Sequence, residues 1–268
     1  AKLYFNKLLD MKHRADEANI YLARIAASEK DFDLASVHFQ QVRVGPQYPL
    51  AQIQMALMLE DQNKVDQALA VLDQAADAMP AEKAKFTMAK SEVLSASGQM
   101  AKAITVLDQG LEQLPDDTNM LYTRAMLKEQ LDDFSGMEAD LRRVLELQPN
   151  NSAALNALGY TFANRNQRLN EAWELIERAY NLNPSDPAII DSMGWIKYRL
   201  GETQVALDFL RKAYEAFDDQ EIAAHLGEVL WVSGQREEAA IIWRNALEKN
   251  PESDVLKEVM GRFLPTTP

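Results

Sequence analysis

Residues 171–201 read EAWELIERAYNLNPSDPAIIDSMGWIKYRLG and contain two apolar helical segments joined by a short turn. Ala172 and Gly194 place small side chains among larger apolar ones, which lets two helices approach each other closely. Pro184 lacks a backbone N–H and ends the first segment. Gly201 suits the left-handed conformation with which many helices end. The stretch therefore predicts packed α-helices separated by tight turns.

The same features recur on both sides of this stretch. Five prolines follow an apolar segment at intervals of 34 or 35 residues, with a last interval of 67: Pro80, Pro115, Pro149, Pro184 and Pro251. In a 34-residue unit with this proline at position 32, small residues recur at position 8: Ala23, Ala56, Ser91, Ala125, Gly159, Gly194 and Gly227. Position 20 is also small in every unit except one, which has Met137. A fixed period of this length indicates a repeat protein.

This pattern resembles the consensus of the tetratricopeptide-repeat (TPR) family, in which each repeat is a helix–turn–helix unit. The resemblance implies an all-α solenoid, a right-handed superhelix of antiparallel helix pairs. We predict sixteen helices and no sheet. Seven repeats cover residues 16–253, with the bounds 16–48, 49–83, 84–117, 118–151, 152–186, 187–219 and 220–253. An extra residue in the fifth repeat lengthens its turn, so we expect the second helix there to restart at Asn170.

The two ends of the chain continue the phase of the repeat. Residues 1–15 match the second helix of a truncated repeat, so we expect the chain to be a piece of a longer protein. Phe5, Leu8 and Leu9 are then expected to leave apolar surface exposed, which favours weak self-association through this helix. Residues 254–268 are predicted to form a C-terminal capping helix and a tail.

Composition limits the classes of function. The formal net charge of −13 argues against nucleic acid as a partner, because binding a polyanion is driven by Lys and Arg. No apolar run approaches the roughly 20 residues of a membrane helix, so we expect no membrane contact by this chain. Without cysteine, thiolate catalysis and cysteine-based zinc sites are excluded. No nucleotide-binding or nucleophile motif is present, and His13, His38 and His225 are interpreted as ordinary packing or surface residues. We predict no enzyme activity, no cofactor and no metal site.

The first helix of each TPR repeat offers positions 2, 5, 9, 12 and 13 to a partner. In repeats five to seven these positions gather aromatic, amide and charged side chains, as binding hot spots do, and predict a protein-binding groove of Asn156, Tyr160, Asn164, Asp191, Trp195, Tyr198, Arg199, Glu228 and Trp231. Trp195 is expected to be an exposed anchor outside the core. Tyr198 and Trp231 have an alternative interpretation as packing residues, and Trp173 and Trp243 are assigned to the core. Acidic residues outnumber basic ones along the groove, which disfavours an acidic tail as the ligand.

Repeats five to seven also contain sequence segments that are more specific than the general TPR consensus. The segments LNALGYTFANR (155–165), the stretch 171–201 and AAHLGEVLWVSGQREEAAIIWRNALEKNP (223–251) resemble TPR lipoproteins of Gram-negative bacteria. The resemblance implies a periplasmic protein whose full-length form is anchored to the outer membrane by an N-terminal lipid. It also implies an adaptor that brings a carboxyl-terminal processing protease together with protein substrates such as peptidoglycan hydrolases.

Two alternatives stay open. The chain is a scaffold for envelope assembly or polysaccharide export, or it is the regulatory arm of a larger enzyme with an upstream catalytic domain. In the full-length gene, a lipobox followed only by repeats would favour the adaptor, and a catalytic motif would favour the enzyme.

Overall fold

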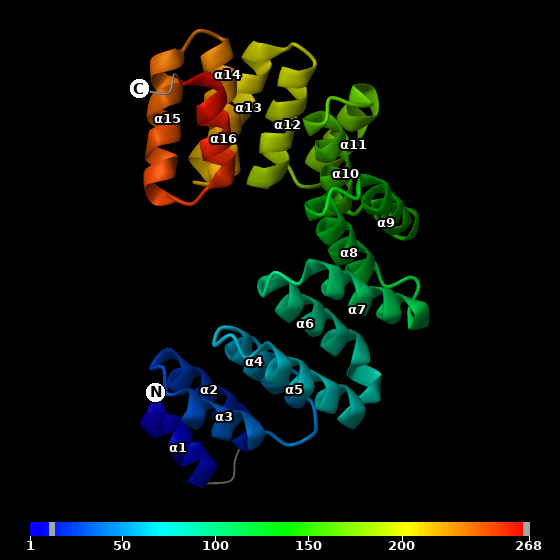
Figure 1. Ribbon diagram of the computed structural model, residues 1–268, viewed down its shortest axis with the longest axis vertical. Helices are drawn as coiled ribbons and strands as arrows, with labels where there is room; N and C mark the ends of the chain where they lie inside the picture. Colours follow the sequence, from blue (N-terminus) through cyan, green and yellow to red (C-terminus); the bar gives the residue numbers. More distant parts are fainter. Residues whose placement is uncertain (11–13, 265–268) are drawn as a thin grey trace. The chain divides into compact units, whose positions relative to one another are not determined.

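A computed structural model describes residues 1–10 and 14–264 of the chain. Within them the structure is all-helical, with sixteen α-helices, a short 3₁₀ turn at Pro80–Glu82 and no strand, as predicted (Figure 1). The helices are α1 (Lys2–Asp10), α2 (Ala15–Ser28), α3 (Phe32–Gln40), α4 (Tyr48–Glu60), α5 (Val65–Ala78), α6 (Lys83–Ala96), α7 (Met100–Gln113), α8 (Thr118–Gln130), α9 (Phe134–Leu147), α10 (Ser152–Asn164), α11 (Leu169–Leu182), α12 (Pro187–Arg199), α13 (Thr203–Ala216), α14 (Gln220–Val232), α15 (Arg236–Lys249) and α16 (Asp254–Phe263).

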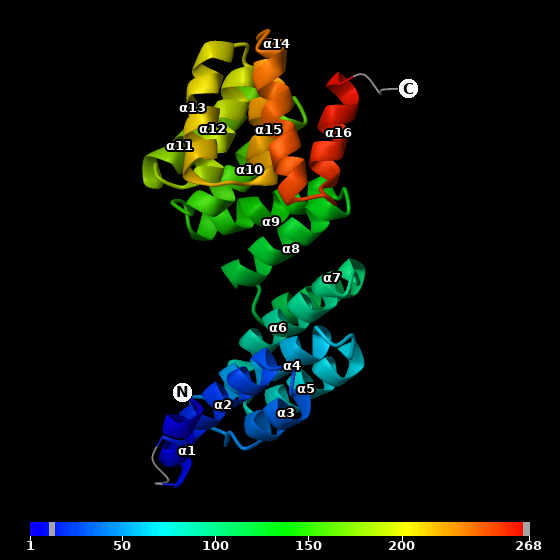
Figure 2. The same ribbon diagram turned by 90° about the vertical axis from the view of Figure 1, so that its left-hand side faces the viewer.

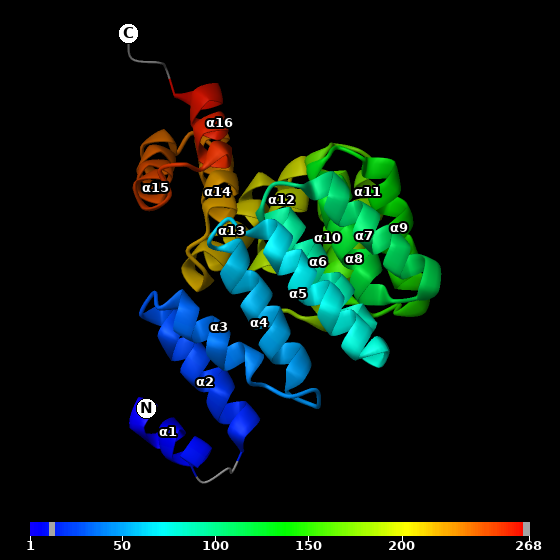
Figure 3. The same cartoon turned by 60° about the horizontal axis from the view of Figure 1, so that its bottom comes forward.

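Consecutive helices pack as pairs within two compact units, residues 1–140 and 141–268. In the first unit α2 packs on α3, α4 on α5 and α6 on α7 (Figure 3). In the second unit α10 packs on α11, α12 on α13 and α14 on α15 (Figure 2). Second helices also contact the first helix of the next pair, as α11 does with α12 and α13 with α14. This nearest-neighbour packing is that of a repeat solenoid. The superhelical twist along the whole chain stays a prediction.

Each unit has its own apolar core. In residues 1–140 a cluster of buried side chains runs from Ile20 in α2 to Val93 in α6. In residues 141–268 one cluster joins Ile190 of α12, Ala213 of α13 and Ile222 of α14, with half-buried aromatic rings packed around it. The boundary between the units falls inside α9.

The turn inside each repeat has one conformation throughout. At position 15 of the repeat the backbone has positive φ in all seven turns, at Lys30, Asn63, Gly98, Asp132, Asn166, Gly201 and Gly234. The next N–H then donates to the carbonyl five residues back, as Gln235 does to Leu230 at 2.9 Å. This bond closes the helix end in the Schellman arrangement. The predicted left-handed conformation of Gly201 is confirmed, and Lys30 and Asp132 adopt the same conformation without the freedom of glycine.

Position 8 is a close contact between the two helices of a repeat, as its small residues predicted. A Cβ atom added to Gly159 would lie 2.7 Å from Ile176 Cγ1 of α11. One added to Gly194 would lie 2.5 Å from Leu210 Cγ of α13. Because these separations are far below van der Waals contact, only glycine permits the observed approach.

Two local expectations were wrong. The second helix of the fifth repeat begins at Leu169 and not at Asn170, because Arg168 takes the left-handed conformation with φ 45° and ends the turn one residue earlier.

At the N-terminal end, Phe5, Leu8 and Leu9 are half-buried instead of exposed, because α1 packs on α2 and Phe5 stacks on an aromatic ring of that helix. The exposed apolar side chains of α1 are Leu3 and Tyr4, which are 73% and 61% exposed. Self-association through α1 stays a prediction.

Candidate protein-binding site

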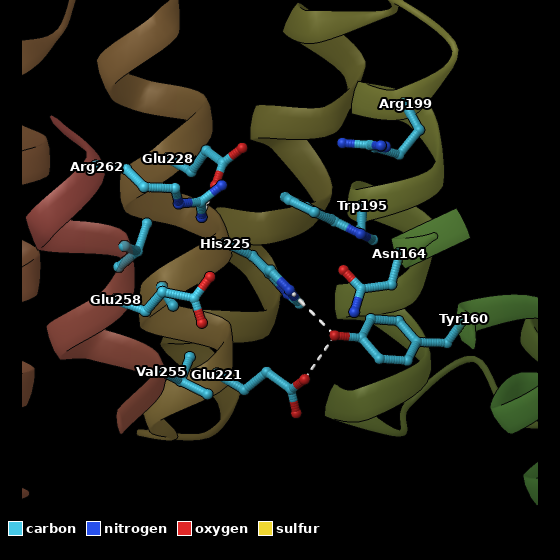
Figure 4. A pocket seen from close by; sticks show the side chains of 12 residues that line it. Tyr160, Asn164, Trp195, Arg199, Glu221, His225, Glu228, Val255, Glu258 and Arg262 are labelled. Carbon is cyan, nitrogen blue, oxygen red and sulfur yellow. Dashed lines mark hydrogen bonds and ion pairs between the residues drawn. The ribbon is translucent and has the colours of Figure 1, made fainter. Parts of the chain in front are cut away.

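The first helices of the last three repeats converge with α16 on one pocket in residues 141–268. We call it the polar pocket; its volume is about 320 Å³ and it is lined by Tyr160, Asn164, Trp195, Arg199, Glu221, Ala224, His225, Glu228, Val255, Glu258, Val259 and Arg262 (Figure 4). Asp186 and Asp219 cap the N-termini of α12 and α14 by accepting backbone N–H bonds, which fixes where these two helices start. α16 packs against α14 and α15 and closes one side of the pocket.

His225 lies at the centre of the polar pocket and is buried. Its Nδ1 lies 2.8 Å from Asp191 Oδ2, and its Nε2 lies 3.3 Å from the Tyr160 hydroxyl, which donates to Glu221 Oε1 at 2.5 Å (Figure 4). Burial by itself would lower the pKa of the imidazole. The charge and hydrogen bond of Asp191, with the charges of Glu221 and Glu228, outweigh burial and raise the pKa of His225. The imidazolium can then donate to Asp191 and Tyr160 together.

Trp195 is buried, with 4% of its surface exposed, so the expectation of an exposed anchor was wrong. Its ring stacks on His225 with the centroids 4.2 Å apart and the planes at 23°, and Tyr198 lies beside it at 5.3 Å. The Arg199 guanidinium lies 5.7 Å from the centroid of the same ring. One edge of Trp195 still lines the pocket, and its Nε1 is buried without a hydrogen-bond partner. The residue therefore serves packing and the pocket at once.

Glu228 joins the pocket to the capping helix. It is buried, and its carboxylate accepts a hydrogen bond from Arg262 Nη2 at 2.7 Å. Its other oxygen lies 3.4 Å from the Tyr198 hydroxyl. Burial, followed by the negative charge of Glu228, raises the pKa of the Tyr198 phenol. Glu228 thus has two partners of its own within the chain, Arg262 and Tyr198.

Trp231 does not line the polar pocket. Its ring stacks on Trp243 at 5.8 Å and lies 6.2 Å from Phe263 of α16. Trp243 is fully buried, as predicted, whereas Trp173 is half-buried with Lys197 Nζ 3.8 Å from its ring centroid. The alternative interpretation of Trp231 as a packing residue is the one that the structure supports.

A second, more apolar pocket of about 220 Å³ adjoins the first. We call it the apolar pocket; it is lined by Asn156, Tyr160, Ala188, Asp191, Ser192, Phe217, Asp219, Glu221 and Ile222. It shares Tyr160 and Glu221 with the polar pocket. Phe217 is 57% exposed here, which is unusual for a ring of that size.

The nine predicted groove residues divide between these places. Five line the polar pocket: Tyr160, Asn164, Trp195, Arg199 and Glu228. Asn156 and Asp191 line the apolar pocket, Tyr198 supports Trp195 from the side, and Trp231 packs elsewhere.

Sequence reasoning missed His225, which occupies repeat position 6, and the α16 residues Val255, Glu258 and Arg262. A usable signal was present in α16: its residues at positions 2, 5 and 9 are those that a first helix of an eighth repeat would present.

The lining of the polar pocket suits binding. It contains no serine, threonine or cysteine nucleophile, and both ring nitrogens of His225 have partners. Among the described residues, no group of three or more histidine or carboxylate side chains could hold a metal ion. Nor does any described helix have the length and apolar character needed to span a bilayer. His38 is half-buried beside Asn19, and His13 lies outside the described residues.

Comparisons with known proteins agree with this architecture. A model of a tetratricopeptide repeat-like domain matches residues 5–136, and a tetratricopeptide-repeat model matches residues 122–187. A TPR repeat-containing protein of Pseudomonas aeruginosa is 44% identical over 213 residues, which are 80% of this chain and 36% of that protein. The chain thus spans about a third of the length of that relative.

Solved structures show the same fold. A tetratricopeptide repeat protein from Parabacteroides merdae superposes with a TM-score of 0.69 at 16% identity, covering 94% of this chain and 100% of that one. PilF from Pseudomonas aeruginosa superposes with a TM-score of 0.61 at 18% identity, covering 80% of this chain and 97% of that one. With the repeat phase, the helix pairs and the matched family models in agreement, the chain belongs to the tetratricopeptide-repeat family.

Proposed function

We propose that this chain is a protein-interaction scaffold in which the polar pocket holds a polypeptide segment of a partner. The observation that carries the proposal is the pocket itself, built from three consecutive first helices and α16, with charged and aromatic side chains directed into it (Figure 4). Trp195 and His225 stack on each other in its lining. Tryptophan, tyrosine and arginine, all present in this pocket, are the residues most enriched in protein-binding hot spots.

The partner class that we propose is a carboxyl-terminal processing protease, its protein substrates, or both. The full-length protein would act in the periplasm, anchored to the outer membrane by an N-terminal lipid. The resemblance of residues 155–165, 171–201 and 223–251 to Gram-negative TPR lipoproteins supports this proposal.

The test is direct binding of the purified chain to the purified protease and to a purified substrate, measured by biolayer interferometry. We expect saturable binding to at least one of them. The variant Glu258→Lys reverses a charge in the pocket, and Glu252→Lys makes the same change at an exposed position outside it. Binding that Glu258→Lys weakens and Glu252→Lys leaves intact would support the pocket. Absence of binding to both proteins would refute the adaptor and favour envelope assembly.

A further inference from the structure

Most of the unsatisfied buried polar atoms of the described residues gather at the two adjoining pockets. Among the described residues, six buried side-chain nitrogen or oxygen atoms lack a hydrogen-bond partner, and four of the six belong to residues that line these pockets. Trp195 Nε1 and Arg199 Nε are donors at the polar pocket, whereas Asn156 Oδ1 and Asp191 Oδ1 are acceptors at the apolar pocket. Buried polar groups are normally paired, so unpaired ones at a pocket point to a ligand that pairs them.

The two pockets form one continuous track. Both are lined by Tyr160 and Glu221, whose hydrogen bond separates them. A peptide backbone that crosses this bond offers carbonyl oxygens to the donors on one side and N–H groups to the acceptors on the other. Side chains at positions i and i+2 of an extended peptide lie on the same face about 7 Å apart, which suits two adjacent pockets.

The charges of the polar pocket favour a cation. Arg262 forms an ion pair with Glu228, and His225 is hydrogen-bonded to Asp191, so these four groups already have partners within the chain. Glu258 has no ion-pair or hydrogen-bond partner in the part of the chain that the structure describes.

The ends of the polar pocket also differ. Figure 4 shows Glu221 and Glu258 toward one end and Trp195 and Arg199 toward the other. Apart from the groups that pair with one another, the charged side chains of the polar pocket are the carboxylates of Glu221 and Glu258 and the guanidinium of Arg199. A basic side chain between Glu221 and Glu258 would complement that end of the pocket.

The apolar pocket supplies the other half of the specificity. Phe217 and Ile222 contribute apolar surface, and the exposed ring of Phe217 has room for a partner side chain. From these features we infer that the track binds an extended segment with a Lys or Arg side chain in the polar pocket and an apolar side chain two residues away in the apolar pocket. This inference rests on the proposed function, since it specifies the polypeptide that the scaffold recognises.

The experiment uses fluorescein-labelled peptides with blocked ends and a serine background. One peptide carries Leu and Lys two positions apart, a second replaces Lys with Glu, and a third replaces Leu with Ser. Fluorescence anisotropy with the whole chain should show that the Leu/Lys peptide binds about tenfold tighter than the Leu/Glu peptide. Added salt should narrow that ratio, because exposed charges are screened.

Variants test the assignment residue by residue. Glu258→Lys should reverse the charge preference, and Glu252→Lys should leave it unchanged. Glu258→Gln removes the charge without reversing it, and this variant tests the same assignment if Glu258→Lys disturbs folding. Trp195→Phe keeps a ring on His225 but removes the unpaired Nε1 donor, so it should weaken every peptide without altering the preference for Lys.

Equal or tighter binding of the Leu/Glu peptide, or no peptide binding at all, would overturn the inference. If the purified protease or substrate still binds the chain in that case, the proposed scaffold function stands and only the peptide chemistry is wrong. If neither proteins nor peptides bind, the proposed function fails as well.

Discussion

Gly227 offers the sharpest test of how the C-terminal unit packs. It lies at position 8 of the seventh repeat, where α14 meets the indole of Trp243 in α15. A Cβ atom at this position would lie 2.6 Å from Trp243 Cδ1 and nearer still to Nε1. The indole cannot easily move aside, because it is fully buried and stacked between Trp231 and Phe263. The perturbation is therefore the smallest possible one, Gly227→Ala.

The expected cost has three parts. Overpacking of a well-packed core costs about 1–3 kcal/mol. Displacing the ring would also weaken the Trp243 Nε1 bond to the Ala224 carbonyl, 3.3 Å long, which is worth about 1 kcal/mol. Against these, alanine in a helix gains about 1 kcal/mol over glycine. We expect Gly227→Ala to lower the free energy of unfolding by about 1–3 kcal/mol, which is the sum of these terms.

Gly261→Ala is the matched control. Gly261 is also helical, in α16, but an added Cβ would meet nothing within 4 Å. There the helix-propensity gain acts alone, so stability should rise by up to about 1 kcal/mol.

Urea denaturation followed by tryptophan fluorescence is a suitable assay, because all four tryptophans, at positions 173, 195, 231 and 243, lie in the second unit. A Gly227→Ala variant as stable as the wild type, or more stable, would refute the close contact at position 8.

Three further predictions concern single residues. Lys30→Gly should stabilise residues 1–140 by about 0.5–1 kcal/mol, because Lys30 has φ 63°; a lower melting temperature by circular dichroism would contradict this. Trp195→Ala should destabilise the second unit by about 3–5 kcal/mol in urea, since the ring is buried, and an unchanged midpoint would show that it is not a packing residue. The raised pKa of His225 means that its charged form stabilises the fold at low pH and that this contribution is lost as pH rises through the raised value. The difference in unfolding free energy between the wild type and His225→Gln should therefore shrink with rising pH. A difference that grows with pH would contradict a raised pKa of His225.

The fold was predictable because its determinants repeat along the chain. Position 8 is small wherever two helices of a repeat must touch, as at Gly159 and Gly194, and that contact is made within about one repeat length. The turn at position 15 is likewise set by local backbone geometry. A glycine such as Gly98 indicates its positive φ in the sequence, whereas Lys30 has the same positive φ without any such signal. Local rules of this kind act on neighbouring residues, so a periodic sequence displays them many times.

The candidate site was predictable only in part. The repeat phase placed Tyr160, Arg199 and Glu228 on the correct face, since that face follows from position within a first helix. It did not show that Trp195 would be covered by His225, because that cover comes from the next repeat and depends on which side chain stands there.

The chain's periodic pattern was therefore enough to determine the helix pairs, their close contacts and the face that carries the pocket. The tertiary structure alone decided that His225 is buried with Asp191 and Tyr160 as partners, and that α16 adds Glu258 and Arg262 to the pocket. It also decided that Trp231 packs against Phe263 instead of facing a partner. The physical reason is that burial and pKa depend on every group packed around a side chain. In a solenoid some of those groups come from a neighbouring repeat, whose side chains the consensus does not specify.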